Sequence, residues 1–175
     1  GIVEEFRLYS TQLNQTQIQQ LGQQMGPVHM WRFDDSNTAT TVIRDLGTAG
    51  VNLVLTNATL RNVAADNNYS NSAVSTGSMF LNGTTAFAQA YSPGILRDNP
   101  RTVSFWMKPS SNANPASTQQ LFNYGNLSVN GQSFSVIRTT TSQIAVNVGY
   151  STTAINSTRS VNNTLWNHVG VVVLP

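Results

Sequence analysis

The chain has 175 residues, of which 39% are hydrophobic and 9% aromatic, which is enough for one domain with a packed core. Charged residues make up only 9%, the net charge is +2 and the basic residues are scattered, so the sequence offers no basic patch for nucleic acid. It contains no cysteine, which excludes disulfides and thiolate metal sites, and no apolar run near the ~20 residues that span a bilayer. The polar surface must therefore consist of Asn, Thr, Ser and Gln, which favours an extracellular or cell-surface location.

Residues 2–9 predict a β-strand. Ile2, Glu4, Phe6 and Leu8 would share one face, and Tyr9 would lie on the other. A short helix near residues 14–21 is expected to follow. Asn14 suits the N-cap, and Gly22 suits the position just beyond the C-terminal end of the helix.

Residues 23–27 read as a linker, because they are polar and glycine-containing and end in a proline. From there on, short alternating stretches separated by turn residues predict strands. The predicted strands are residues 28–33, 41–44, 51–63, 79–81, 86–91, 102–108, 121–124, 133–138, 143–150 and 166–173. Asn82-Gly83 predicts a hairpin turn between two of them. The pattern indicates an all-β fold, an antiparallel β-sandwich with one short helix.

Four stretches in order resemble the laminin-G-like, concanavalin-A-like lectin and glucanase family of jelly rolls. They are His29-Met30-Trp31-Arg32-Phe33-Asp34-Asp35, Phe80-Leu81-Asn82-Gly83, Thr102-Val103-Ser104-Phe105-Trp106-Met107-Lys108-Pro109 and Leu165-Trp166-Asn167-His168-Val169-Gly170-Val171-Val172. The first stretch contains the Phe-Asp that usually ends the family's opening strand, and the last matches its Trp-x-His-Val strand. The resemblance implies a jelly roll over most of residues 28–173.

Residues 4–9 together with 13–21 resemble the closing strand and terminal helix of the same family, which normally follow the Trp-x-His strand. The order therefore predicts three parts: a closing strand and helix over 1–22, a linker over 23–27, and an incomplete jelly roll over 28–175. An incomplete sheet exposes unpaired backbone groups, which some strand must cover. We expect the assembly strand, with Ile2, Glu4, Phe6, Leu8 and Tyr9, to be donated to a neighbouring domain or copy.

Donation between copies would be head-to-tail and would build a fibre or stalk. A segment cut from a tandem array of domains would show the same order, so this interpretation stays open. A self-closed, permuted monomer is disfavoured, because the strands usually found between His168 and the closing unit are missing. The sequence thus predicts a non-enzymatic structural or adhesive protein whose partners are copies of itself or adjacent repeats. The alternative is a carbohydrate-binding, lectin-like module.

No catalytic constellation is visible in the sequence. Glycoside hydrolysis needs two facing carboxylates, whereas adjacent Glu4 and Glu5 would point to opposite faces of a strand. His29 and His168 lie in apolar strands, which favours structural histidines. We therefore predict no enzyme and no cofactor.

Other candidate sites are assigned by residue type. Asp34 and Asp35 are candidate calcium ligands in a turn, although an Asx turn is the preferred interpretation and no metal is predicted. Four tyrosines near loops could stack on sugars: Tyr69, Tyr91, Tyr124 and Tyr150. The tryptophans Trp31, Trp106 and Trp166 are assigned to the core. Seven Asn-x-Ser/Thr sequons are possible N-glycosylation sites: Asn14, Asn57, Asn68, Asn82, Asn126, Asn156 and Asn162.

Overall fold

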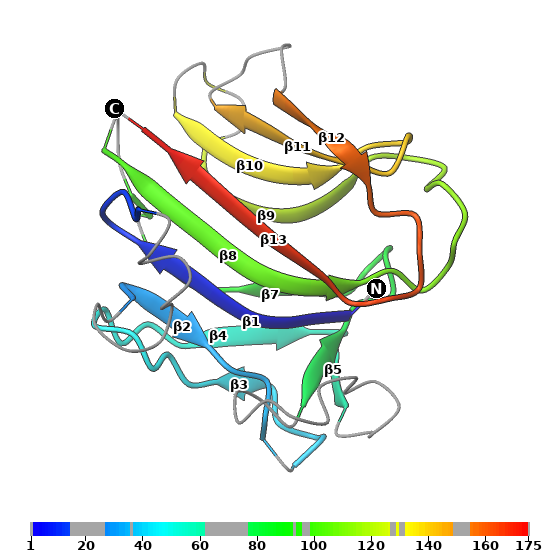
Figure 1. Ribbon diagram of the computed structural model, residues 1–175. Helices are drawn as coiled ribbons and strands as arrows, with labels where there is room; N and C mark the ends of the chain where they lie inside the picture. Colours follow the sequence, from blue (N-terminus) through cyan, green and yellow to red (C-terminus); the bar gives the residue numbers. More distant parts are fainter. Residues whose placement is uncertain are drawn as a thin grey trace. The chain divides into compact units, whose positions relative to one another are not determined.

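The structure is a computed structural model that describes residues 2–14, 27–35, 37–61, 77–92, 94–95, 99–126, 129, 132–148 and 155–174. Within these residues the chain forms β-strands that pair antiparallel, and no helix occurs there (Figure 1). The predicted all-β, sandwich-like class is therefore confirmed. Apart from Asn14, the helix expected near residues 14–21 lies outside the described residues.

The strand bounds agree with the alternating stretches of the sequence in most places. The strands are β1 (Ile2–Tyr9), β2 (His29–Trp31), β3 (Val42–Ile43), β4 (Leu53–Thr56), β5 (Thr59–Arg61), β6 (Ser78–Phe80), β7 (Phe87–Gln89), β8 (Arg101–Lys108), β9 (Gln119–Gly125), β10 (Ser133–Arg138), β11 (Gln143–Val148), β12 (Ile155–Ser160) and β13 (Asn167–Val173). The sequence missed β12, because its polar residues show no alternation. It also merged β4 and β5, which Asn57 separates with a φ of 52°.

The chain divides into two compact units. Unit 1 comprises Gly1–Ser92, Asn99–Lys108 and Trp166–Pro175, and unit 2 comprises Pro93–Asp98 and Pro109–Leu165. Strand β1 lies in the same unit as β2 to β7. The division expected at residues 23–27 stays a prediction. Unit 1 contains a six-stranded sheet in the order β13-β8-β1-β6-β5, with β2 on β1, and a three-stranded sheet β3-β4-β7. Unit 2 contains the four-stranded sheet β12-β11-β10-β9.

Strand β1 is the central strand of the six-stranded sheet. It pairs with β8 on one side and with β6 and β2 on the other. Leu8 is opposite Val103, but Val3 is opposite Met107, so a one-residue register shift falls between Glu4 and Arg7. Phe6, Leu8 and Tyr9 are buried, and the Phe6 ring stacks on Phe105 with centroids 5.4 Å apart.

In this chain β1 closes its own sheet, which is the arrangement that the sequence analysis disfavoured. The missing strands that argued against it do not prevent closure, because β8 accepts β1 directly on the side opposite β13. A copy of β1 from a neighbour would pair with β8 in the same register. Donation between copies therefore stays a prediction, and the pairing with β8 defines the contact that it would use.

The hairpin predicted at Asn82-Gly83 is wrong. Strand β6 pairs with β5 and β1, whereas β7 pairs with β4 in the other sheet of unit 1. The Asn82 side chain instead organises the crossing between the two sheets, because its Oδ1 accepts hydrogen bonds from the backbone N–H groups of Thr84, Thr85 and Ala86. Asn-Gly favours a left-handed turn, and Gly83 does have a φ of 78°, but the turn alone does not decide which strands pair.

Candidate functional site

The most organised polar cluster in unit 1 is a chain of three side chains from separate segments. His29 on β2 places Nδ1 2.7 Å from Oδ2 of Asp45, and its Nε2 lies 3.0 Å from Oγ of Ser92. An ionised carboxylate only accepts, so Nδ1–H of His29 donates to Asp45, and Nε2 of a neutral imidazole accepts from the Ser92 hydroxyl. This order of groups is that of a Ser-His-Asp triad.

Asp45 holds more than the histidine. Its Oδ1 accepts from the backbone N–H groups of Met30 and Gly47, and its Oδ2 accepts from the N–H of Val51. Burial by itself raises the pKa of Asp45, but these backbone hydrogen bonds and the one from His29 outweigh it and hold the pKa below its usual value of 3.8. The ionised carboxylate thus fastens β2 to the turn that follows β3.

The surroundings of His29 favour a structural role. The imidazole is only 3% exposed, and it stacks on Trp31 with ring centroids 5.0 Å apart and planes 8° from parallel. A catalytic histidine of this kind must reach the leaving group of a substrate, which a buried and stacked ring cannot do without a rearrangement. Trp31 is itself buried and donates from Nε1 to the carbonyl of Val51, as expected of a core tryptophan.

The second histidine, His168 on β13, contacts side chains of β8, the neighbouring strand of the same sheet. Its Nε2 lies 2.9 Å from Oγ of Ser104, and its ring lies 4.9 Å from that of Trp106 on the neighbouring strand. These are cross-strand contacts between β13 and β8, which pair residue for residue. They give His168 a structural explanation, as the sequence predicted for it.

Both candidate calcium ligands are engaged by protein groups. Asp34 forms an ion pair with Arg32 at 3.0 Å, and Asp35 accepts from the N–H of Asn37 and from the hydroxyl of Thr40. The hydrogen bond from the N–H of Asn37 to the Asp35 side chain is that of the predicted Asx turn. Within the described ranges, no group of three or more His, Cys, Asp and Glu side chains lies close enough to hold a metal ion.

Of the four candidate sugar-stacking tyrosines, two lie among the described residues, one in each unit. Tyr69 and Tyr150 lie outside the described residues, and Tyr124 in unit 2 stacks on Phe134 with centroids 5.4 Å apart. Of the two described, Tyr91 is the more exposed, with 81% of its surface open to solvent, whereas Tyr124 is half-buried. It follows β7, at the end of the three-stranded sheet.

The solvent-exposed face of the β3-β4-β7 sheet is unusually apolar. Val42 on β3 is opposite Val54 on β4, which is opposite Gln89 on β7, and all three side chains are exposed. Phe87 lies two residues before Gln89 and is 49% exposed. Together with Tyr91 these residues form what we call the Phe87 face. The sequence predicted a strand over residues 86–91, but it did not show that β4 and β3 lie beside it.

The asparagines of the sequons differ in the contacts and the exposure of their side chains. The side chain of Asn82 is used in the turn described above, and Asn57 contacts the carbonyl of Thr85 through Nδ2 at 3.4 Å. Asn68 lies outside the described residues. The other four are exposed: Asn14, Asn126, Asn156 and Asn162.

Unit 2 contains a buried arginine that the sequence did not single out. Arg138 at the end of β10 donates to Oε1 of Gln119, to the carbonyl of Ala113 and to Oγ of Ser142. Burial lowers its pKa, and all of these acceptors are neutral. Three neutral oxygens from different segments thus hold the end of the β10–β11 hairpin together. A lone arginine in a strand gives no signal of this in the sequence.

Comparison with known proteins finds no family model, no curated protein and no solved structure that matches the chain. The resemblance to laminin-G-like jelly rolls therefore depends on the four sequence stretches alone. The described part of the chain contains no helix long and apolar enough to cross a membrane.

Proposed function

We propose that the chain is a non-enzymatic structural or adhesive protein of the extracellular space or cell surface, a subunit or repeat that joins its neighbours head-to-tail by β-strand complementation. The supporting observation is the position of β1. It fills a slot between β8 on one side and β2 and β6 on the other. Without it, both edges of the slot would lose their backbone partners, and the rings that contact Phe6 would be uncovered.

A slot of this kind can be filled by β1 of the same chain or by β1 of another copy. The contacts are the same in both cases, so the choice depends on the connection between β1 and β2 and on protein concentration. When each copy fills the slot of the next, the contact is heterologous and continues into a filament unless it closes as a ring. The low charge of the chain, 9% of residues, reduces repulsion between stacked copies.

Electron microscopy of the concentrated protein tests this proposal. We expect filaments or rings from the full chain, and their loss when residues 1–22 are deleted, because no β1 is then left to donate. Val42→Lys, on an exposed position of β3, serves as the control and should leave the filaments unchanged. Isolated particles at every concentration of the full chain, or filaments from the deletion variant, would contradict the proposal.

Carbohydrate binding is the second candidate, and the Phe87 face favours it. Exposed aromatic rings beside an amide, with no charged group among Val42, Val54, Phe87, Gln89 and Tyr91, suit stacking on sugar rings with one polar contact. On a glycan array, binding should weaken roughly tenfold for Tyr91→Ala and again for Phe87→Ala, as expected for loss of one stacked ring each. Val148→Ala, exposed in unit 2, is the matched control. An array without hits removes this candidate.

A further inference from the structure

Strand β13 forms one edge of the six-stranded sheet, and β8 is its one neighbour among the described strands. Its pairing with β8 runs through seven consecutive positions, from Asn167 opposite Met107 to Val173 opposite Arg101, without a register shift. Every second residue of such an edge strand directs its N–H and C=O away from the sheet. From Val169 to Val173 this regular edge therefore offers backbone donors and acceptors to another strand.

The sequence of β13 lacks the features that usually protect an edge. Natural edge strands are kept from pairing by charged side chains, proline, bulges or short length. No residue from Val161 to Leu174 is charged, and no proline lies among them. Val172 and Leu174 are 38% and 55% exposed, which gives the edge an apolar rim.

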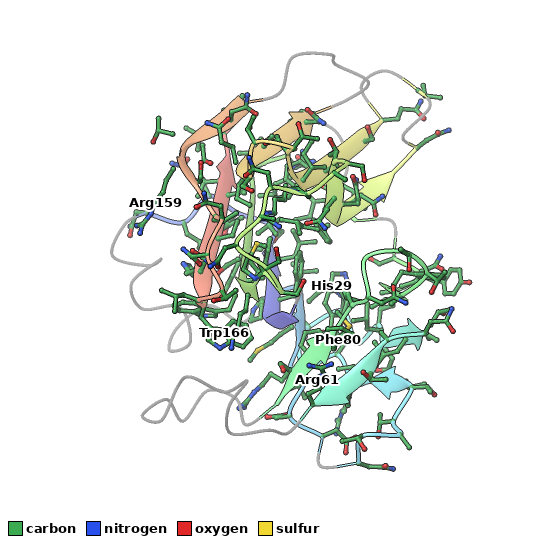
Figure 2. The ribbon with its side chains drawn as sticks, turned by 90° about the vertical axis from the view of Figure 1, so that its right-hand side faces the viewer. His29, Arg61, Phe80, Arg159 and Trp166 are labelled. Atoms are coloured by element: carbon green, nitrogen blue, oxygen red, sulfur yellow. The ribbon has the colours of Figure 1, made fainter. Side chains whose placement is uncertain are left out.

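The other edges in the described part of the chain differ from β13. Strands β3, β5 and β7 have only two or three residues, and β5 ends at Arg61, whose guanidinium lies over the Phe80 ring at 3.8 Å (Figure 2). In unit 2, β12 carries the exposed Arg159, and its pairing with β11 contains a register shift. The pairing of β9 with β10 is shifted as well. Strand β13 is thus the edge best suited to pairing.

We propose that the β13 edge binds β13 of a second copy in antiparallel orientation. Because β13 has no charged side chain, two copies of it can pair without repulsion between like charges. A partner strand with charged side chains would find no opposite charge on β13 with which to form an ion pair. In a register centred on Gly170, each Gly170 is opposite that of the other copy, and Val169 is opposite Val171 of the second copy. In this register even-numbered residues are opposite even-numbered ones, and odd-numbered residues are opposite odd-numbered ones. Side chains on one face of the first sheet therefore adjoin side chains on the same face of the second sheet.

This contact is isologous and therefore closes as a dimer, unlike the head-to-tail exchange of β1. Its central pairs are Gly170 with Gly170 and Val169 with Val171, and it is independent of the proposed function. In a filament built by exchange of β1, the same edge would join neighbouring filaments side by side.

Substitutions at Gly170 test the proposal. A side chain fits there, because an added Cβ would meet nothing nearer than Cε1 of His168 at 3.9 Å. In light scattering coupled to size exclusion, we expect a concentration-dependent species of twice 19.0 kDa. Gly170→Lys should abolish it, because two ammonium groups would meet at the twofold axis, whereas Gly170→Thr, with a good strand former, should retain it. Gly170 lies outside β1, so a dimer that Gly170→Lys abolishes is distinguished from exchange of β1, which this substitution leaves unchanged.

Cross-linking gives the second readout. Directly opposed Cα atoms of antiparallel strands lie about 4.5–5.5 Å apart, within the range of a disulfide. Gly170→Cys should therefore form disulfide-linked dimers on mild oxidation, and Val42→Cys, on the exposed edge strand β3, should not. A dimer that tolerates Gly170→Lys, or equal cross-linking of the two cysteine variants, would overturn the proposal, as would a strictly monomeric chain.

Discussion

Replacing Phe6 by alanine should lower the free energy of unfolding by about 3–5 kcal/mol, the usual cost of removing a buried phenylalanine ring. Phe6 is 7% exposed, stacks on Phe105 at 5.4 Å and lies 6.1 Å from Trp31. The substitution removes these contacts from the middle of the sheet and leaves a cavity between β8 and β2. Phe6→Leu keeps most of the volume and should cost roughly half as much.

Urea denaturation followed by tryptophan fluorescence measures this loss, since Trp31 reports on the same part of the core. Ile155→Ala, at a position 76% exposed on β12, is the control and should change the unfolding free energy by less than about 0.5 kcal/mol. If Phe6→Ala cost no more than the control, β1 would not occupy the centre of the sheet.

The second large effect is expected at Asp45. Asp45→Ala leaves three backbone N–H groups and His29 without their acceptor. Each buried donor that loses its partner costs about 1–3 kcal/mol, partly recovered where water can enter, so a total loss of about 3–5 kcal/mol is expected. Asp45→Asn keeps the size and one acceptor oxygen and should lose less.

The same carboxylate makes stability depend on pH. Its pKa is lower in the folded chain than the usual 3.8, so its contribution is fully present above that value and is lost as pH falls through the folded pKa. Between about pH 5 and pH 2, the unfolding free energy of the native chain should fall more steeply than that of Asp45→Asn. Parallel curves for the two proteins would show that Asp45 is not the anchor we describe. Asp35→Asn, in the exposed Asx turn, is the matched control.

Much of the fold could be predicted from the sequence, because alternation marks half-buried strands directly. Residues 102–108 and 143–150 were assigned as strands, and the structure has β8 at Arg101–Lys108 and β11 at Gln143–Val148. Strand pairing was harder to predict. The turn at Asn82-Gly83 is local, whereas its flanking strands find partners far along the chain, so the expected hairpin does not form.

The polar clusters could not be assembled from the sequence. Asp45 precedes a Gly-containing turn, which is a recognisable signal for a side chain that binds backbone N–H groups. Its partner His29 lies sixteen residues away, and Ser92 sixty-three residues from His29, so only the folded chain brings them together. The β13 edge was visible as an apolar strand, but its position at the border of the sheet depends on where β1 inserts.

Exchange of β1 between copies is tested most directly with two cysteines in a chain that has none of its own. Leu8 and Val103 are opposite each other in the β1–β8 pair and both are buried. When Leu8→Cys and Val103→Cys proteins are unfolded in urea, mixed, refolded together and oxidised, we predict a disulfide-linked species of twice 19.0 kDa that neither protein forms alone. If the mixture yields no such species, while the double variant gives only monomers with an internal disulfide, β1 stays in its own chain and strand exchange is excluded.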